Sequence, residues 1–428
     1  MSAIFPATRT ERSAHPSLTF SNILFSSLAA LVIGSIPILT MYTEAWQLIF
    51  GGLLASLTVI IALFNLANVS SRQLLQNAML YSFLLVPVLM SVFINSSNPA
   101  SVLNIASLIL FVILGPCLLP NSFPAGANGY SWNFFFLCVG LVLGVGVVYI
   151  LAEAAISDWA DIVENRRDAL DFVSINLHPN LLGLLCVTIA VGSSGFRSEL
   201  LRGAVTIFSL VPAWAASSRD AMLGISVAYV CPFICRHAQG KWEGWRRQRK
   251  NTLLLLGGAL VLAFLFRGPI TSFLSQDVLL LDDPDRGADS GFSERTEIWQ
   301  AALALWEEEP LFGVGYKNGP EAMGMEVYAH NMVLVLLSET GLFGLAGFTA
   351  FCVLVGRNGL ALLRGGDGQR ATLILTSLAV YWIYGLFEGL AINVGNPLSV
   401  CFFLVCFAST GGERLGSLTR GLAVRPAS

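Results

Sequence analysis

Long runs of apolar residues recur along the whole chain, and they constrain its fold more than any other feature. Such runs can cross a bilayer as helices of about 17–25 residues, because a helix satisfies its own backbone hydrogen bonds in lipid. Only 12% of the residues are charged, whereas soluble domains carry about 25%. The sequence therefore predicts an all-α integral membrane protein.

About twelve membrane-spanning helices are expected, together with one large polar loop that contains short helices. The loop covers 269–330, so that helices 1–9 fall within 1–268, and helices 10–12 with a cytoplasmic tail fall within 331–428. The predicted spans are 22–42, 46–66, 78–95, 101–119, 132–152, 177–193, 203–217, 221–235, 251–268, 331–356, 371–387 and 396–410.

Basic residues are distributed unevenly between the two sides of this predicted topology. With the N-terminus inside, 17 of the 24 Lys and Arg residues fall in inside segments and 7 fall outside. The positive-inside rule then places both termini in the cytoplasm and the 269–330 loop on the outer side. The basic stretch 241–250, which contains Trp242 and Trp245, would be cytoplasmic. There it is better interpreted as a contact with anionic membrane lipids than with nucleic acid.

The long loop contains a predicted helix and a glycine-rich turn. The helix begins near Ser293 and ends before Pro310, with Trp299 and Trp306 on its apolar stripe. We expect this helix to lie on the membrane surface, with both Trp side chains among the lipid headgroups. Residues 313–315 (GVG) follow no strand and precede no GK[ST], so a tight turn is preferred over a nucleotide-binding loop.

Three residues at the predicted outer surface are candidates for chemistry. Arg219 lies in a short turn between two spans, where it either pairs with Asp220 or binds a phosphate group through its planar, always charged fork. Arg295, in the first turn of the loop helix, has the same two interpretations with its acidic neighbours. His330 precedes the tenth span, where a His is either a hydrogen-bonded cap or a proton acceptor near neutral pH.

Metal binding and transport are the main alternatives to consider. The eight Cys residues lie in or beside apolar spans without a CxxC pair, and the loop lacks the DxDxDG spacing of a calcium site, so no metal is expected. A polysaccharide or lipid transporter would place ionisable residues near the bilayer midplane. Here the charges cluster at the outer end, and Glu339 and Glu388 are the nearest exceptions.

Several short motifs occur in an order that resembles a known family. They are Asn176–Asn180 (NLHPN), Ser218-Arg219, Arg295 with Trp299, Pro310–Gly315 (PLFGVG), His330-Asn331 and Gly341–Gly344 (GLFG). With this order and topology, roughly residues 170–350 resemble the bacterial O-antigen ligase and polysaccharide polymerase superfamily.

The resemblance implies a metal-independent, inverting glycosyltransferase of the bacterial inner membrane, with a periplasmic active site and no cofactor. Its donor would be a glycan linked to undecaprenyl diphosphate. Arg219 and Arg295 would stabilise the departing diphosphate, and His330 would accept the proton of the acceptor hydroxyl. The further substrate-binding residues implied are Arg166, Arg167, His178, Ser218 and Asn331.

The acceptor would distinguish two members of this superfamily. A surface polysaccharide polymerase, for exopolysaccharide or O-antigen, extends another lipid-linked glycan, whereas an O-antigen ligase transfers the glycan to lipid A-core. The segments 295–299 (RTEIW) and 387–390 (FEGL) favour the polymerase. Ser293-Glu294 stands where many polymerases carry Gly, and this departure leaves the subtype open.

Overall fold

A computed structural model describes the part of the chain that contains the candidate residues. The described residues are 71–95, 179–215, 218–239, 293–325, 328–392 and 396–410, with isolated helical positions between 105 and 142. Every regular element within them is a helix, so the all-α prediction is confirmed for this part of the chain. The predicted spans at 22–42, 46–66 and 251–268 lie outside the described residues.

The predicted spans that fall within the described segments are helical. They are α3 (Ser71–Asn95), α7 (Pro179–Ser193), α8 (Glu199–Ala215), α9 (Arg219–Ala238), α14 (Met332–Arg364), α15 (Gly368–Gly385) and α16 (Pro397–Ala408). Three stretches are long and apolar enough to cross a membrane, namely Leu74–Asn95, Arg219–Ala238 and Met332–Arg364. The expected loop helix is also present as α12 (Ser293–Glu308), and α13 (Gly319–Met323) follows it.

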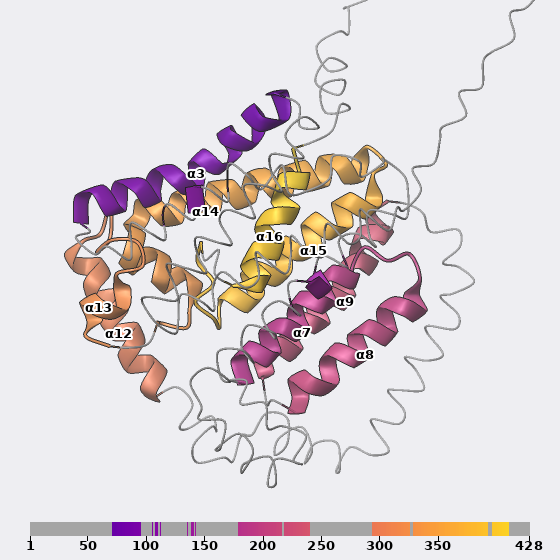
Figure 1. Ribbon diagram of the computed structural model, residues 1–428, viewed down its shortest axis with the longest axis horizontal. Helices are drawn as coiled ribbons and strands as arrows, with labels where there is room; N and C mark the ends of the chain where they lie inside the picture. Colours follow the sequence, from indigo (N-terminus) through magenta and orange to yellow (C-terminus); the bar gives the residue numbers. More distant parts are fainter. Residues whose placement is uncertain are drawn as a thin grey trace, which may run out of the picture.

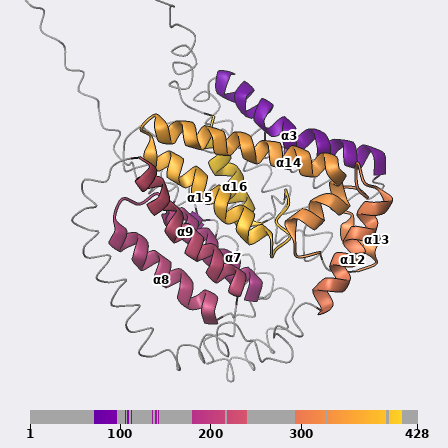
Figure 2. The same ribbon diagram turned by 180° about the vertical axis from the view of Figure 1, so that it is seen from behind.

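The helix α14 connects the parts of the described bundle. Figure 1 shows α3 (indigo) lying along α14, and the two helices pack where Gly347 meets the backbone of Phe83. The helix α12 packs near the start of α14, while α15 returns along it and packs against α9. Figures 1 and 2 place α12 and α13 on one side of the bundle and α8 on the opposite side.

Aromatic side chains fill the core between α3, α14, α15 and α16. The ring of Tyr81 stacks on Phe407 with centroids 4.4 Å apart, and Tyr381 stacks on Phe402 at 4.1 Å. The Tyr81 hydroxyl donates to the carbonyl of Phe403 at 2.6 Å. A buried phenol needs such a partner, because an unpaired hydroxyl would carry a desolvation cost. These contacts fix the helices that present the candidate site.

The helices α9 and α15 run antiparallel, which determines the two ends of the bundle. Cys235 packs with Ala371 near the end of α9 and the start of α15. At the other end, a Cβ added to Gly224 would lie 3.4 Å from the ring of Tyr384. The N-terminus of α9, which begins at Arg219, therefore lies beside the C-terminus of α15.

The end of the bundle far from Arg219 contains several buried or half-buried cations. Glu199 forms ion pairs with Arg202 and Arg236, and Arg370 donates to the carbonyl of Ala408. The side chain of Arg202 is fully buried, and its guanidinium carbon lies 4.6 Å from the centre of the Phe233 ring. Ion pairing and stacking on aromatic rings offset the cost of burying these charges.

The helix α14 differs from the predicted span 331–356 in two ways. It continues to Arg364, and Gly366, with φ of 89°, follows its end. It is also interrupted at Gly341, where φ is 64° and ψ is −167°. A glycine adopts this conformation without the steric cost that a side chain would bring. The tenth span is therefore two helical segments that meet at a break.

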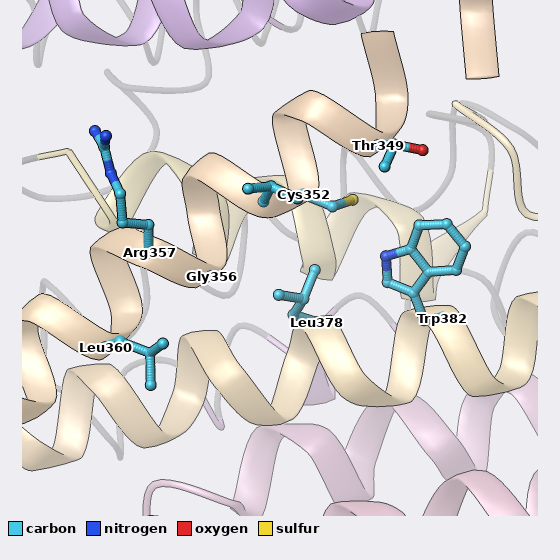
Figure 3. A pocket seen from close by; sticks show the side chains of 8 residues that line it. Thr349, Cys352, Gly356, Arg357, Leu360, Leu378 and Trp382 are labelled. Carbon is cyan, nitrogen blue, oxygen red and sulfur yellow. The ribbon is translucent and has the colours of Figure 1, made fainter. Parts of the chain in front are cut away.

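An apolar groove of about 500 Å³ lies between α14 and α15. Figure 3 shows Cys352 and Gly356 of α14 facing Leu378 and Trp382 of α15 across it. Its lining contains none of the candidate residues Arg219, Arg295 and His330. The groove is thus separate from the candidate site.

Candidate functional site

The backbone before α14 holds His330 in an unusual conformation. His330 has φ of 44°, a left-handed value that is uncommon outside glycine. The next residue, Asn331, is the N-cap of α14, and its side-chain oxygen accepts from the N–H groups of Val333 at 2.9 Å and Leu334 at 3.2 Å. Such a cap stabilises the helix start. His330 is therefore presented immediately in front of a firmly capped membrane helix.

Both ends of the Asn331 amide are used within the protein. Its oxygen caps α14, and its Nδ2 donates to the carbonyl of Leu386 at 3.1 Å. This second bond ties the start of α14 to the segment after α15. Asn331 thereby positions its neighbour His330, and its predicted contact with substrate stays a prediction.

A carboxylate that the sequence interpretation did not assign to the site contacts His330. The Nδ1 atom of His330 lies 3.2 Å from Oε2 of Glu388, and the two side chains are 32% and 15% exposed. A carboxylate at Nδ1 favours the tautomer that carries its proton there, which leaves Nε2 as the basic nitrogen. Glu388 had stood out as a charged residue beside an apolar span and as part of the segment 387–390, and these were the available signals.

The helix α12 places Arg295 on the same side of the bundle as His330. Trp299 donates through its indole N–H to the carbonyl of Ala329, the residue before His330, at 2.7 Å. Arg295 is half-buried and lies one helical turn before Trp299, so the two share a face of α12. The contact between α12 and the end of the loop thus brings Arg295 and His330 into one region.

The ring of Trp299 is partly buried against the hydrophobic core, and its N–H is bonded to the carbonyl of Ala329. This contact satisfies both the apolar ring and the polar N–H of the indole within the protein. The expected position of the two Trp side chains among lipid headgroups stays a prediction. Trp306 lies further along α12, where its N–H donates to Pro310 at 3.3 Å in an exposed position.

Arg219 lies at the first turn of α9, with Ser218 before it. Ser218 is buried, and its hydroxyl donates to a carboxylate oxygen of Asp220 at 2.8 Å. Arg219 itself is half-buried. The N-terminus of a helix carries a partial positive charge and exposed N–H groups, which add to the attraction of the guanidinium for an anion. This arrangement suits a phosphate group.

The three candidate residues lie toward the same end of the described bundle. The start of α9 with Arg219 lies beside the end of α15, after which the chain reaches Glu388. A Cβ added to Gly385 would lie 3.0 Å from the side chain of Met332, so the start of α14 lies there too. The ion-paired arginines lie at the opposite end. The predicted residues Arg166, Arg167 and His178 lie outside the described residues.

The glycine-rich motif Pro310–Gly315 packs its backbone against the break in α14. Two N–H groups of the motif donate to carbonyls that the break leaves open, and two N–H groups beyond the break donate back to the motif. The four bonds are Val314 N to Ser338 O at 2.8 Å, Gly315 N to Glu339 O at 3.1 Å, Leu342 N to Pro310 O at 2.9 Å and Phe343 N to Leu311 O at 3.1 Å. We call this contact the junction.

Glycine is required on both sides of the junction. Gly313 has φ of 66°, and a Cβ there would overlap the backbone of Glu339. Gly341 has φ of 64°, and a Cβ there would overlap the backbone of Leu311. The helix α3 adds two side-chain bonds, because Ser91 donates to the carbonyl of Glu339 at 2.6 Å and Asn95 donates to the carbonyl of Gly313. The interrupted backbone within the membrane is thereby satisfied.

The residues after the junction are tightly packed around charged groups. The backbone N–H of Lys317 donates to Oε2 of Glu339 at 3.0 Å, and the Lys317 ammonium lies 4.9 Å from the centre of the Tyr328 ring. Burial lowers the pKa of Lys317, while the negative charge of Glu339 acts in the opposite direction. Within the described segments, no group of three or more His, Cys, Asp and Glu side chains has an arrangement that could hold a metal ion.

Comparison with known families matches the part of the chain that contains the three candidate residues. Residues 204–349 match the family model described as O-Antigen ligase. The match begins within α8, includes Arg219, Arg295 and His330, and ends within α14, before Glu388. A comparison with curated proteins finds no match. The match supports a relationship of residues 204–349, which contain the three candidate residues, to the O-antigen ligase and polymerase superfamily.

Proposed function

We propose that this protein is an inverting, metal-independent membrane glycosyltransferase that builds a surface polysaccharide. Its donor is a glycan carried on undecaprenyl diphosphate, and its acceptor is a second lipid-linked glycan. The observation that carries the proposal is the placement of Arg219, Arg295 and the His330–Glu388 pair at one end of the bundle. Two cations and a base are the groups that this reaction needs.

The reaction is a single displacement at the anomeric carbon of the donor. The acceptor hydroxyl oxygen forms a bond to that carbon while the bond from the carbon to the diphosphate oxygen breaks. The electron pair of the broken bond leaves with undecaprenyl diphosphate, and the hydroxyl proton passes to Nε2 of His330. Attack from the face opposite the leaving group inverts the configuration.

Each residue has a distinct role in this step. The guanidinium groups of Arg219 and Arg295 stabilise the charge that develops on the departing diphosphate, as positioned cations do for other leaving oxygens. The carboxylate of Glu388 orients the His330 ring and stabilises the imidazolium that forms, a role that acidic partners of catalytic His residues fulfil elsewhere. The Glu388 side chain is only 15% exposed, and this burial strengthens its interaction with His330 relative to the same interaction in water.

The distribution of charge supports a periplasmic site. Arg202, Arg236 and Arg370 lie at the end of the bundle opposite Arg219. Arginines concentrate on the cytoplasmic side of membrane proteins. The end with His330 then faces the periplasm, where lipid-linked glycans are polymerised and no nucleotide sugar is required. The protein would lie in the bacterial inner membrane with both termini in the cytoplasm.

The similarity of residues 204–349 to the O-antigen ligase family supports transfer to lipid A-core as the second candidate function. Both functions share the donor and the displacement step, and they differ in the acceptor. The acceptor is therefore the variable that an experiment must change.

The proposal is tested with the purified protein in lipid vesicles and a chemically defined oligosaccharide on undecaprenyl diphosphate. The polymerase predicts longer lipid-linked glycans from the donor alone, whereas the ligase predicts transfer only when lipid A-core is added. His330→Ala should abolish either product, and His237→Ala is the matched control at the opposite end of α9, where His237 is exposed. Movement of the donor across the vesicle without a new glycosidic bond would support a transporter instead and contradict the proposal.

A further inference from the structure

Three residues with strained backbones lie in one region of the structure. Among the described residues, the non-glycine positions with positive φ are Lys317 (63°), His330 (44°) and Ile392 (44°). Each such residue costs on the order of 1–3 kcal/mol, and it persists only where surrounding contacts determine the conformation. The question is therefore what holds these three positions, which are far apart in the chain.

Tyr316 connects two of the three strained positions. It directly precedes Lys317, and its hydroxyl donates to the carbonyl of Ile392 at 2.7 Å. The side chain is 2% exposed. Burial and the negative charge of Glu339 raise the pKa of the Tyr316 phenol, so it stays protonated and acts as a hydrogen-bond donor.

The junction fixes the end of the loop from which Tyr316 projects. Gly315, the residue before it, donates to the carbonyl of Glu339 at 3.1 Å. Lys317, the residue after it, donates to the Glu339 carboxylate at 3.0 Å. Glu339 is 2% exposed in the outer segment of α14. The backbone on both sides of Tyr316 is therefore bonded to a single residue of the membrane helix.

The segment 386–392, which Tyr316 contacts, carries Glu388. Asn331 donates to the carbonyl of Leu386 at 3.1 Å, and Tyr381 donates to the carbonyl of Leu390 at 2.6 Å. Tyr316 holds the far end of the segment at Ile392. Glu388 lies between these attachments, and its carboxylate contacts Nδ1 of His330 at 3.2 Å. Three side chains thus determine where the partner of His330 sits.

We propose that Tyr316 is a positioning residue: its hydroxyl fixes the 386–392 segment to the junction and so holds the Glu388 carboxylate against His330. The loop motif and the break in α14 then serve the reaction without touching substrate. This inference rests on the proposed function for its catalytic consequence, while its structural part stands on the Tyr316–Ile392 bond.

The test is Tyr316→Phe in the full-length protein, which removes the hydroxyl and keeps the ring. Tyr81→Phe is the matched control, because the Tyr81 hydroxyl is also buried and donates to a backbone carbonyl, that of Phe403, at 2.6 Å. Both variants should lower the unfolding temperature by similar small amounts. Amide hydrogen exchange should rise within 386–392 in Tyr316→Phe and stay at the wild-type level there in Tyr81→Phe, since exchange reports local opening.

Glycan transfer provides the second measurement. Tyr316→Phe should lower kcat by about tenfold with little change in the donor KM, because one lost buried hydrogen bond corresponds to roughly a factor of ten and the loss acts through the position of Glu388. Tyr81→Phe should keep wild-type kcat. Adding Tyr316→Phe to Glu388→Gln should cause no further loss, because residues that act through one another are not additive.

The possible results of these experiments test the positioning role of Tyr316 and the proposed function separately. Unchanged exchange within 386–392 in Tyr316→Phe would overturn the positioning role, whatever the activity. Multiplied losses in the double variant would also overturn it, because Tyr316 would then act independently of Glu388. Absence of transfer in the wild-type protein would overturn the proposed function, and the exchange measurement would still decide whether Tyr316 positions the segment.

Discussion

The Nδ1 atom of His330 lies 3.2 Å from Oε2 of Glu388, although 58 positions separate the two residues in the sequence. Neither residue lies within a helix, and each is held by contacts from neighbouring elements. The pair joins the end of the long loop to the segment after α15. Changing Glu388 therefore tests directly whether His330 acts as a base whose ring is oriented by this carboxylate.

Glu388→Gln should reduce transfer because the amide cannot stabilise the imidazolium that forms on His330. We expect kcat to fall about 100-fold, at the lower limit for loss of general-base assistance. The measurement is the initial rate of glycan transfer from a defined lipid-linked donor. Glu309→Gln is the control, since Glu309 is an exposed carboxylate in the loop that ends at His330. Equal rates for Glu388→Gln and wild type would remove Glu388 from the mechanism.

Arg219→Lys and Arg295→Lys should each keep a positive charge yet lose most of the activity. A lysine lacks the planar fork that binds two phosphate oxygens at once, so we expect kcat/KM to fall by about tenfold or more in each variant, as for loss of a charge-assisted hydrogen bond. Arg197→Lys is the control, because Arg197 is exposed and precedes α8 at the opposite end of the bundle. Wild-type kcat/KM in either lysine variant would show that its guanidinium is not used.

Trp299→Phe should disturb the position of α12 relative to His330. The variant keeps an apolar ring and loses the N–H that donates to Ala329 at 2.7 Å. Loss of one partly buried hydrogen bond should cost about 1 kcal/mol of stability, and the transfer rate should fall several-fold because Arg295 and His330 are no longer held in register. Thermal unfolding and transfer rates would be measured together.

Trp306→Phe is the internal comparison for this variant, since the Trp306 N–H makes an exposed and longer bond of 3.3 Å. It should leave both measurements near wild type. A Trp306→Phe loss as large as that of Trp299→Phe would mean that α12 is needed as a whole, not through the Trp299 contact.

Gly313→Ala and Gly341→Ala should be strongly destabilising. In both, a methyl group would overlap the backbone of the opposite side of the junction. We expect a loss above about 3 kcal/mol, since neither backbone can move without breaking the junction. The control is Gly324→Ala, because Gly324 also has positive φ, 65°, but open space around its Cβ position. That change should cost only about 1–2 kcal/mol. Thermal unfolding of the purified variants would show whether the three losses differ.

The helical segments were predictable because apolar length and glycine or proline punctuation report directly on spanning helices. The spans predicted at 78–95, 177–193 and 396–410 correspond to α3, α7 and α16. The loop helix was also predictable, since Ser293 and Pro310 mark its limits. The break at Gly341 was not, because a single glycine within an apolar run does not reveal whether a distant loop supplies the missing hydrogen bonds.

The sequence was a better guide to which residues form the candidate site than to the contacts that these residues make. His330, Arg219 and Arg295 stood out as charged residues in a chain with few of them, and the structure places them at one end of the described bundle. Glu388 was missed as a site residue because its partner lies 58 positions away. The contact of Trp299 with Ala329 was not predicted, since an amphipathic stripe fits a lipid surface and a protein groove equally well.

The junction also determines which residues can change during evolution in the two motifs that form it, the glycine-rich motif of the loop and the motif at the break in α14. Its four hydrogen bonds join backbone atoms only, and backbone contacts place no demand on the identity of the side chains between them. Val314 and Leu311 could be replaced by other apolar residues, while Gly313 and Gly341 could not. Diverged relatives should therefore keep the spacing of these two glycines even where the residues around them differ. A sequence search based on that paired spacing should detect more distant relatives than one based on overall identity.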